Sequence, residues 1–465
     1  MVFSSISFLY FFLPAVLVLH TVLPKRFKNI ALLVSSLAFY FASEQFYIVL
    51  LLFSSVVDYC CSMLISKGRL KRASAVTSIV INLLLLGIFK YFDFFVGSIN
   101  SSFGISIPLL RVALPVGISF YTFQTMSYTL DVYMGRVKAS KNFLDFITYV
   151  TLFPQLIAGP IVRYENVEKE LSERKVSLSM FSEGIGVFAV GLAKKVILSN
   201  QLAELVEKFS SSSEQTVLFH WVYIVAYTLQ VYFDFSGYSD MAVGMGKMLG
   251  FSFPQNFNYP FIASTVAEYW RRWHITLGTW FRDYLYFPLG GSRCGKLKTV
   301  RNIFIVWFLT GLWHGAAWNF VLWGVFFAFV ICAERFIFQK LLKRTPKALK
   351  HIYVLITVAI SMVIFNGNGI SVSAKQLLAM IGIGADGVFG VEALYYLKSY
   401  AMVIIVSVIA AIPVFKRVRE KLLQYSRHYK VAENLLSPII PAVLIIFSTA
   451  YLVDGSFNPF LYFRF

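Results

Sequence analysis

Two histidines, His274 and His314, lie where side chains suited to chemistry are concentrated. The first stands in RRWHITLGTWFRDY, with three arginines nearby, and the second stands in TGLWHGAAWNF, among glycines and tryptophans. A buried histidine loses its charged form to desolvation, so its pKa falls from about 6.5 and the ring is neutral at pH 7. A neutral imidazole accepts protons, and general base catalysis contributes about 10² to 10⁴ in rate. We take His314 as the candidate base, with His274 or a carboxylate orienting it or polarising the acyl carbonyl. The alternative is that each histidine is a structural residue.

Two carboxylates flank a glycine in the segment FDFSGYSD. Asp234 and Asp240 stand there with Ser236 between them, in a chain that is otherwise mostly aliphatic around them. One carboxylate in the middle of a bilayer costs on the order of 3 kcal/mol even on the lenient insertion scale. The segment therefore predicts a cavity that these three residues line, and the alternative for the carboxylates is a helix-capping role.

Three arginines close to His274 are candidates for binding an anionic substrate. Arg271, Arg272 and Arg282 can hold phosphate groups through charge-assisted hydrogen bonds. Contact with lipid head groups is the alternative. The sequence has no G-x-S-x-G elbow and no P-loop, so it offers no other familiar chemistry. Its four cysteines have neither the pattern of a disulfide framework nor a zinc spacing, and we predict no metal site.

The elements that position these residues must be membrane helices. The chain is 58% hydrophobic and 14% charged, where a soluble domain has about 25% charged residues, and its mean hydropathy is +0.70. Several apolar runs approach the roughly 20 residues that span a bilayer, and none alternates with the period of a barrel strand. They include residues 6–23, 46–65, 217–232, 302–313, 321–333 and 438–453. The sequence therefore predicts an all-α polytopic membrane protein.

Basic residues come in short bursts between the apolar runs. The net charge is +19, from 42 basic and 23 acidic residues, but bursts of this kind are what the positive-inside rule produces, so we predict no nucleic-acid partner. The first burst follows Pro24 directly, which predicts an inner end there and an amino terminus outside. We expect ten or eleven crossings in one domain over residues 1–465, with the catalytic core at about 114–333.

Some segments depart from plain spanning helices. Residues 114–133 carry hydroxyls and amides that predict a helix facing the bundle interior. The prolines and glycine of FPQLIAGPIVRY, at 153–164, predict a re-entrant turn, and the polar EKELSERK, at 168–175, predicts a loop. Residues 254–291 are polar and aromatic at once, which predicts short helices in the interface or dipping into the protein. The aromatic ending NPFLYFRF predicts an interfacial tail.

These motifs together resemble a known family. RRWHITLGTWFRDYLYFPLGGSR and GLWHGAAWNFVLWG are similar to the signature of the membrane-bound O-acyltransferase (MBOAT) family, in its bacterial branch with alginate O-acetyltransferase and the D-alanyl transferase of teichoic acid modification. FDFSGYSDMAVGMGKMLGF, FPQLIAGPIVR and NPFLYFRF also resemble that branch. The resemblance implies a ring of transmembrane, re-entrant and interfacial helices around a central funnel and tunnel. It also implies that His314 is catalytic with His274 as the second family histidine, and that Asp234, Ser236, Asp240 and Trp313 lie near the site.

The resemblance further implies a function. It predicts an acyltransferase that moves an acyl group, here acetyl, from a cytoplasmic thioester such as acetyl-CoA to a hydroxyl of a cell-envelope or extracellular polysaccharide, with no bound cofactor. The expected setting is the bacterial inner membrane, with an SGNH or esterase-like acetyltransferase in the periplasm or outside the cell as partner. Two alternatives stay open: D-alanyl transfer to teichoic acid from a carrier-protein thioester, and a transporter or flippase that depends on neither histidine.

Overall fold

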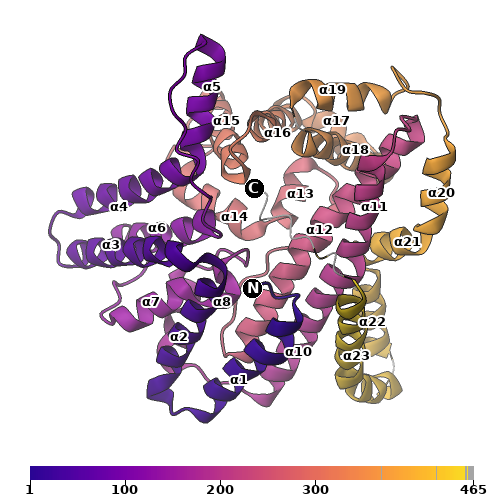
Figure 1. Ribbon diagram of the computed structural model, residues 1–465. Helices are drawn as coiled ribbons and strands as arrows, with labels where there is room; N and C mark the ends of the chain where they lie inside the picture. Colours follow the sequence, from indigo (N-terminus) through magenta and orange to yellow (C-terminus); the bar gives the residue numbers. More distant parts are fainter. Residues whose placement is uncertain (368, 426, 456–457, 459–465) are drawn as a thin grey trace. The chain divides into compact units, whose positions relative to one another are not determined.

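The computed structural model describes residues 1–367, 369–425, 427–455 and 458, and these residues form helices with no strand (Figure 1). The chain divides into two compact units, which are described one at a time. Unit 1 comprises Met1–Phe188 and Tyr238–Gln255, and unit 2 comprises Ala189–Gly237 and Asn256–Phe465. The prediction of one domain over the whole chain stays a prediction. The ending NPFLYFRF lies, apart from its first residue, outside the described residues.

Unit 1 contains the amino-terminal helices and the last turns of one long helix. Its helices are α1 (Leu13–Val22), α2 (Lys25–Glu44), α3 (Ile48–Ser66), α4 (Lys71–Leu86), α5 (Phe92–Phe103), α6 (Ile118–Tyr133), α7 (Phe143–Thr151), α8 (Phe153–Leu156), α9 (Tyr164–Glu173), most of α10 (Leu178–Ala193) and the end of α12 (Val217–Met248). Helix α6 is buried at every residue from 118 to 129, which confirms that its polar face points into the protein.

A buried polar cluster joins three helices of unit 1. The carboxylate of Asp58 on α3 accepts from Asn82 Nδ2 on α4 at 2.7 Å, from Thr129 Oγ1 on α6 at 2.7 Å, and from the hydroxyl of Ser78. All four side chains are fully buried. An unpaired polar group in this environment costs several kcal/mol, so the shared hydrogen bonds select this arrangement of α3, α4 and α6.

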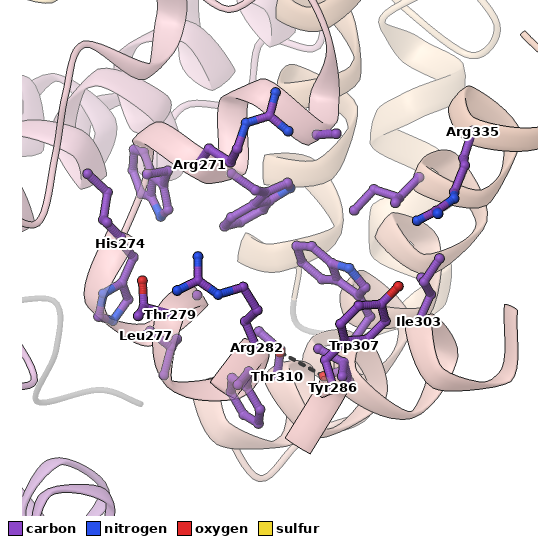
Figure 2. A pocket seen from close by; sticks show the side chains of 18 residues that line it. Arg271, His274, Leu277, Thr279, Arg282, Tyr286, Ile303, Trp307, Thr310 and Arg335 are labelled. Atoms are coloured by element: carbon purple, nitrogen blue, oxygen red, sulfur yellow. Dashed lines mark hydrogen bonds between the residues drawn. The ribbon is translucent and has the colours of Figure 1, made fainter. Parts of the chain in front are cut away.

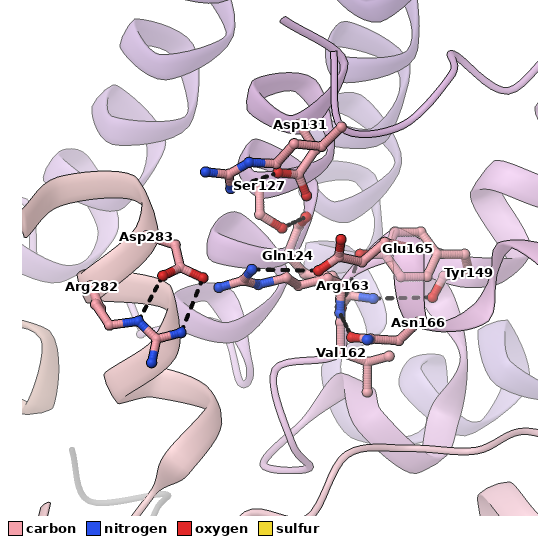
Figure 3. Close-up of polar contacts among 11 residues, drawn as sticks. Gln124, Ser127, Asp131, Tyr149, Val162, Arg163, Glu165, Asn166, Arg282 and Asp283 are labelled. Carbon is pink, nitrogen blue, oxygen red and sulfur yellow. Dashed lines mark hydrogen bonds and ion pairs between the residues drawn. The ribbon is translucent and has the colours of Figure 1, made fainter. Parts of the chain in front are cut away.

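The predicted break in the helix at 153–164 is confirmed. Helix α7 ends at Thr151, α8 is a single turn, and residues 157–163 are buried without helical structure. Figure 3 shows how side chains satisfy this backbone: Tyr149 donates its hydroxyl to the carbonyl of Val162 at 2.9 Å, and Gln124 donates to the carbonyl of Tyr149 at 3.2 Å. The loop predicted at 168–175 is wrong, because α9 covers most of it and buries Tyr164, Val167 and Leu171 along one face.

Unit 2 holds both candidate histidines. Its helices are the end of α10, α11 (Asn200–Ser211), the first part of α12, α13 (Val266–Arg272), α14 (Ile275–Phe281), α15 (Lys296–His314), α16 (Trp318–Phe336), α17 (Gln339–Arg344), α18 (Lys347–Asn366), α19 (Ile370–Ala379), α20 (Val391–Ser399), α21 (Ala401–Ala410), α22 (Val414–Tyr425) and α23 (Arg427–Asp454). Helices α13 and α14 confirm the short helices predicted within 254–291.

Several helices are long and apolar enough to cross a membrane. Among the described residues, five stretches meet that description, and a sixth does if the bent pair α20 and α21 counts as one span. The five are Lys25–Ser66, Lys71–Phe103, Trp318–Phe336, Lys347–Asn366 and Leu436–Asp454. Others are short, charged at one end or interrupted by π-helical turns such as η4 (Lys194–Ser199). The polytopic all-α class is confirmed, and the count of ten or eleven crossings stays a prediction.

Candidate active site

His274 stands at a sharp corner between two short helices. Trp273 alone separates it from α13, and it is the N-cap residue of α14, with φ of 43°, a left-handed conformation that is uncommon for any residue but glycine. Backbone hydrogen bonds of 2.9 Å hold this corner against an extended segment, from Asn258 N to Arg272 O and from Ile275 N to Asn256 O. Strain of this kind persists only where surrounding contacts enforce it, so the segment at 256–258 fixes the position of His274.

Aromatic rings enclose the imidazole of His274, which is 2% exposed. Phe235 on α12 stands edge-on with its centroid 4.7 Å away, Phe257 is stacked at 6.5 Å, and Trp313 on α15 stands edge-on at 5.6 Å. His274 lies outside the candidate spans. Burial lowers its pKa well below the usual value, and the nearby His314 lowers it further, so the ring is neutral at pH 7.

His314 is the last residue of α15 and is 7% exposed. Its ring lies edge-on to Trp313 at 5.1 Å, to Trp323 at 5.0 Å and to Phe365 at 5.7 Å. Trp313 therefore borders both imidazoles. The structure brings together the two histidines that the sequence singled out 40 positions apart, each in an apolar, aromatic surrounding.

Glycines determine how closely α15 and α16 approach. A methyl group on Gly311 of α15 would collide with the backbone oxygen of Phe320, and one on Gly324 of α16 would collide with the backbone oxygen of Trp307. The two glycine Cα atoms lie face to face across the contact. Only glycine permits backbones this close, and the contact sets the end of α15 where His314 stands.

A pocket of about 480 Å³ opens beside His274 (Figure 2). Residues of α13, α14, α15, α16 and the π-helical turn η6 (Arg282–Tyr286) line it, and its wall is mostly apolar. His274 is among the lining residues and His314 is not. Three arginines also line the pocket: Arg271, Arg282 and Arg335.

Two of the three arginines predicted for phosphate binding line the pocket, and the third does not. Arg271 and Arg282 line the pocket, and Arg282 also holds Asp283 with its Nε 2.8 Å from Oδ1, a pair drawn in Figure 3. Arg272 is not a lining residue. It pairs with Glu268 at 2.9 Å and donates to the carbonyl of Asn258 at 3.2 Å, so its guanidinium braces the corner before His274.

Two of the predicted residues of α12, Asp234 and Ser236, flank Phe235 in the sequence, and the Phe235 ring packs on His274. Asp234 forms an ion pair with Lys195 of η4, with Nζ 2.6 Å from Oδ1 and both side chains 2% exposed. Ser236 is fully buried, and its hydroxyl has no partner among the described residues. Asp240 lies farther along the same helix, in unit 1.

Three residues around the site carried no signal in the sequence. Asn256 accepts from His274 and Thr276, Arg335 lines the pocket, and Glu334 accepts from the first amides of α13, at 2.6 Å from Val266 N and 3.0 Å from Ala267 N. Glu334 and Arg335 lie just beyond an apolar run, where charges usually mark a membrane boundary. The described residues contain no cluster of three His, Cys, Asp or Glu side chains suited to a metal ion.

Comparison with known proteins agrees with this architecture. The sequence pattern of the membrane-bound O-acyltransferase family matches residues 32–374. A probable alginate O-acetylase, AlgI of Azotobacter vinelandii, is 39% identical over 392 residues, which cover 83% of this chain and 79% of that protein. The peptidoglycan O-acetyltransferase of Helicobacter pylori is 31% identical over 82% of this chain and 80% of its own length. The teichoic acid D-alanyltransferase of Bacillus subtilis is 28% identical over 48% of this chain and 60% of its own length.

Proposed function

Because the chain belongs to the membrane-bound O-acyltransferase family, we propose that this multi-pass membrane enzyme transfers an acetyl group to a hydroxyl of a cell-envelope or extracellular polysaccharide. The observation that carries the proposal is the pair of buried imidazoles that both contact Trp313, one of which lines a pocket with three arginines. The names of the relatives with the broadest coverage, which refer to alginate and peptidoglycan, support O-acetylation.

The donor in this proposal is a cytoplasmic thioester, acetyl-CoA. Its phosphates are anionic, and the guanidinium groups of Arg271, Arg282 and Arg335 line a pocket whose remaining surface is apolar. Arginine binds phosphate with planar, charge-assisted hydrogen bonds, and the apolar wall suits the uncharged arm of the donor. Arg335 joins the arginines predicted from sequence because of its place in this lining.

His314 is the general base of the proposed reaction. The hydroxyl of the acceptor attacks a thioester slowly until a positioned base takes its proton, and a neutral imidazole does this at pH 7. As the oxygen bonds to the acetyl carbon, the carbon–sulfur bond breaks, and the proton held by the imidazole passes to the departing thiolate. The products are the acetyl ester and the free thiol. Trp313 and the α12 residues Asp234 and Ser236 are proposed to line the path of the substrates, and the role predicted for Asp240 stays a prediction.

D-alanyl transfer from a carrier protein is the second candidate. The relative with that activity matches only about half of this chain, whereas the O-acetylating relatives match more than four fifths. Acetylation is therefore favoured. The transporter alternative is set aside because the chain is an O-acyltransferase.

The proposed setting is the bacterial inner membrane, with the amino terminus outside and basic loops in the cytoplasm. Donor and acceptor then lie on opposite sides of the membrane. An SGNH or esterase-like acetyltransferase in the periplasm or outside the cell is the proposed partner that passes the acetyl group to the polymer.

The variant His314→Ala tests this function. It is expected to abolish ester formation while the protein still inserts in the membrane at the normal level. The measurement is the acetyl content of the envelope polymer in a strain that carries only the variant, with protein amount determined by immunoblot. His220→Gln, which changes a buried histidine near the start of α12, is the matched control and should keep acetylation. Unchanged acetyl content in His314→Ala would refute the assignment.

A further inference from the structure

One oxygen atom of Asn256 receives three contacts from the start of α14. Its Oδ1 lies 3.1 Å from Nδ1 of His274, 2.9 Å from Oγ1 of Thr276 and 3.3 Å from the backbone nitrogen of Thr276. The backbone oxygen of Asn256 accepts from Ile275 N at 2.9 Å. His274 itself provides no side-chain cap to the helix. Asn256 therefore satisfies the first amides of α14 from a distant part of the chain.

The backbone amide of Thr276 determines which way the Asn256 side chain points. A backbone N–H can only donate, so the atom opposite it must be the carbonyl oxygen and not the NH₂ group. The reverse orientation would place two donors face to face and leave a buried backbone amide without an acceptor, which costs about 1–3 kcal/mol. The same oxygen faces Nδ1 of His274, and a carbonyl oxygen only accepts. Nδ1 must therefore carry the proton of this hydrogen bond.

We propose that Asn256 fixes His274 as the tautomer protonated on Nδ1, so that its Nε2 lone pair accepts a hydrogen bond during acyl transfer and does not polarise the acyl carbonyl. The inference rests on the proposed function and deepens it, because it separates the roles of the two histidines. Nε2 is buried and has no partner among the described residues, so it is available to a substrate hydroxyl or to the proton held by His314. Asn256 is a positioning residue, and it acts through His274.

Burial first, and the neighbouring His314 second, favour the neutral ring of His274 by lowering its pKa. The neighbouring titratable side chain is His314, and the same pocket is lined by the guanidinium groups of Arg271, Arg282 and Arg335. The other neighbours are the rings of Phe235, Phe257 and Trp313. Burial removes the water that a charged imidazole needs, and aromatic rings do not replace that water. The polar atom that orients the imidazole of His274 is therefore the neutral amide oxygen of Asn256.

Nuclear magnetic resonance of the ring nitrogens tests the tautomer without any assay of activity. The full-length protein in lipid nanodiscs is labelled with ¹⁵N-histidine, and His274→Gln identifies the signals of His274 among the six histidines. We expect a protonated Nδ1 and a bare Nε2 at pH 7 in the wild type and in Thr276→Val, which removes the hydroxyl but keeps the amide. Asn256→Ala is expected to mix the two tautomers. A wild-type ring protonated on Nε2 would overturn the inference.

Kinetics of Asn256→Asp separates this role from simple helix capping. Asp and Asn cap helices about equally well, so a capping role alone leaves the pH profile unchanged. A carboxylate against Nδ1–H instead favours the charged ring, and an opposite charge at this range shifts a pKa by about 1–3 units. The acid limb of kcat/KM should move up by that amount, with KM little changed. A pH profile of Asn256→Asp that coincides with that of the wild type refutes the inference. If the wild-type protein transfers no acyl group, the proposed function is refuted and the tautomer measured by magnetic resonance still stands.

Discussion

Lys195 and Asp234 form an ion pair inside unit 2, with Nζ 2.6 Å from Oδ1 and 2% of each side chain exposed. The pair connects the π-helical turn η4 to α12, one residue before the ring of Phe235 that packs on His274. Backbones also approach closely here, because a Cβ on Gly237 would lie 2.7 Å from the carbonyl oxygen of Gly191. The ion pair and the close contact together hold the aromatic wall of the site.

Removing one partner of this pair should destabilise the protein strongly. Lys195→Met or Asp234→Asn leaves the other buried side chain without its ion-pair partner, and breaking a buried pair costs about 3–5 kcal/mol. Thermal unfolding in detergent measures the loss. Lys208→Met, which breaks a pair with Glu204 that is about 40% exposed, is the control and should cost about 0–1 kcal/mol. A loss of stability in Lys208→Met as large as that in Lys195→Met or Asp234→Asn would contradict a stabilising role for the buried pair.

The glycine contact between α15 and α16 should not tolerate a methyl group. Gly311→Ala and Gly324→Ala each force the two helices apart, and overpacking of this kind costs about 1–3 kcal/mol. Because the contact sets the end of α15, we expect lower melting temperatures and at least a tenfold loss of kcat from displacement of His314. Gly97→Ala on α5, where a Cβ would meet nothing within 4 Å, is the control. Wild-type activity in both variants would rule out this role.

The carboxylate of Glu334 should control the order of α13. Glu334→Ala removes the acceptor of the buried amide of Val266 and of the half-buried amide of Ala267, and an unsatisfied buried group costs about 1–3 kcal/mol. Glu334→Gln keeps one acceptor and should lose less. Hydrogen exchange of the backbone amides of residues 266–272 measures the effect. We expect the fastest exchange in Glu334→Ala, slower exchange in Glu334→Gln and the slowest in the wild type. Glu420→Gln, in an exposed pair with Lys416, should not change exchange there.

The pocket arginines should differ in their effect on the donor. Arg335→Met and Arg271→Met each remove a lining guanidinium, and a hydrogen bond to a charged group contributes about 1.5–3 kcal/mol, or about 10- to 100-fold in KM for acetyl-CoA. Arg272→Met should change that KM by less than about threefold, because Arg272 pairs with Glu268 outside the pocket. Initial rates of thiol release give these values. A larger effect from Arg272 than from Arg335 would show that the donor binds elsewhere.

Hydropathy and breaker residues were sufficient to predict most helices. The named apolar runs became α1, α3, α12, α15, α16 and α23, and the prolines of FPQLIAGPIVRY did interrupt the helix. The loop expected at 168–175 failed because its polar residues form an amphipathic helix whose buried face depends on tertiary packing. Polar composition indicates exposure, and it does not separate a loop from a surface helix.

The candidate site could be predicted only in part. His274 and His314 stood out because imidazoles are rare in apolar sequence. Asn256 did not, because its partner lies 18 positions away and an asparagine between Gln255 and Phe257 has no distinctive pattern. Arg272 and Arg271 are adjacent in sequence, yet α13 directs one toward Glu268 and the other toward the pocket. Such differences follow from helix orientation, which composition and spacing do not determine.

The aliphatic wall of the pocket offers a route to altered acyl selectivity. Ile303 and Val306 of α15 and Ile331 of α16 form part of the lining. Smaller side chains there would enlarge the space next to His274 and leave the shared oxygen of Asn256 untouched. Redesign of this wall can therefore be used to seek an enzyme that prefers longer acyl groups, with His274, His314 and Asn256 left unchanged.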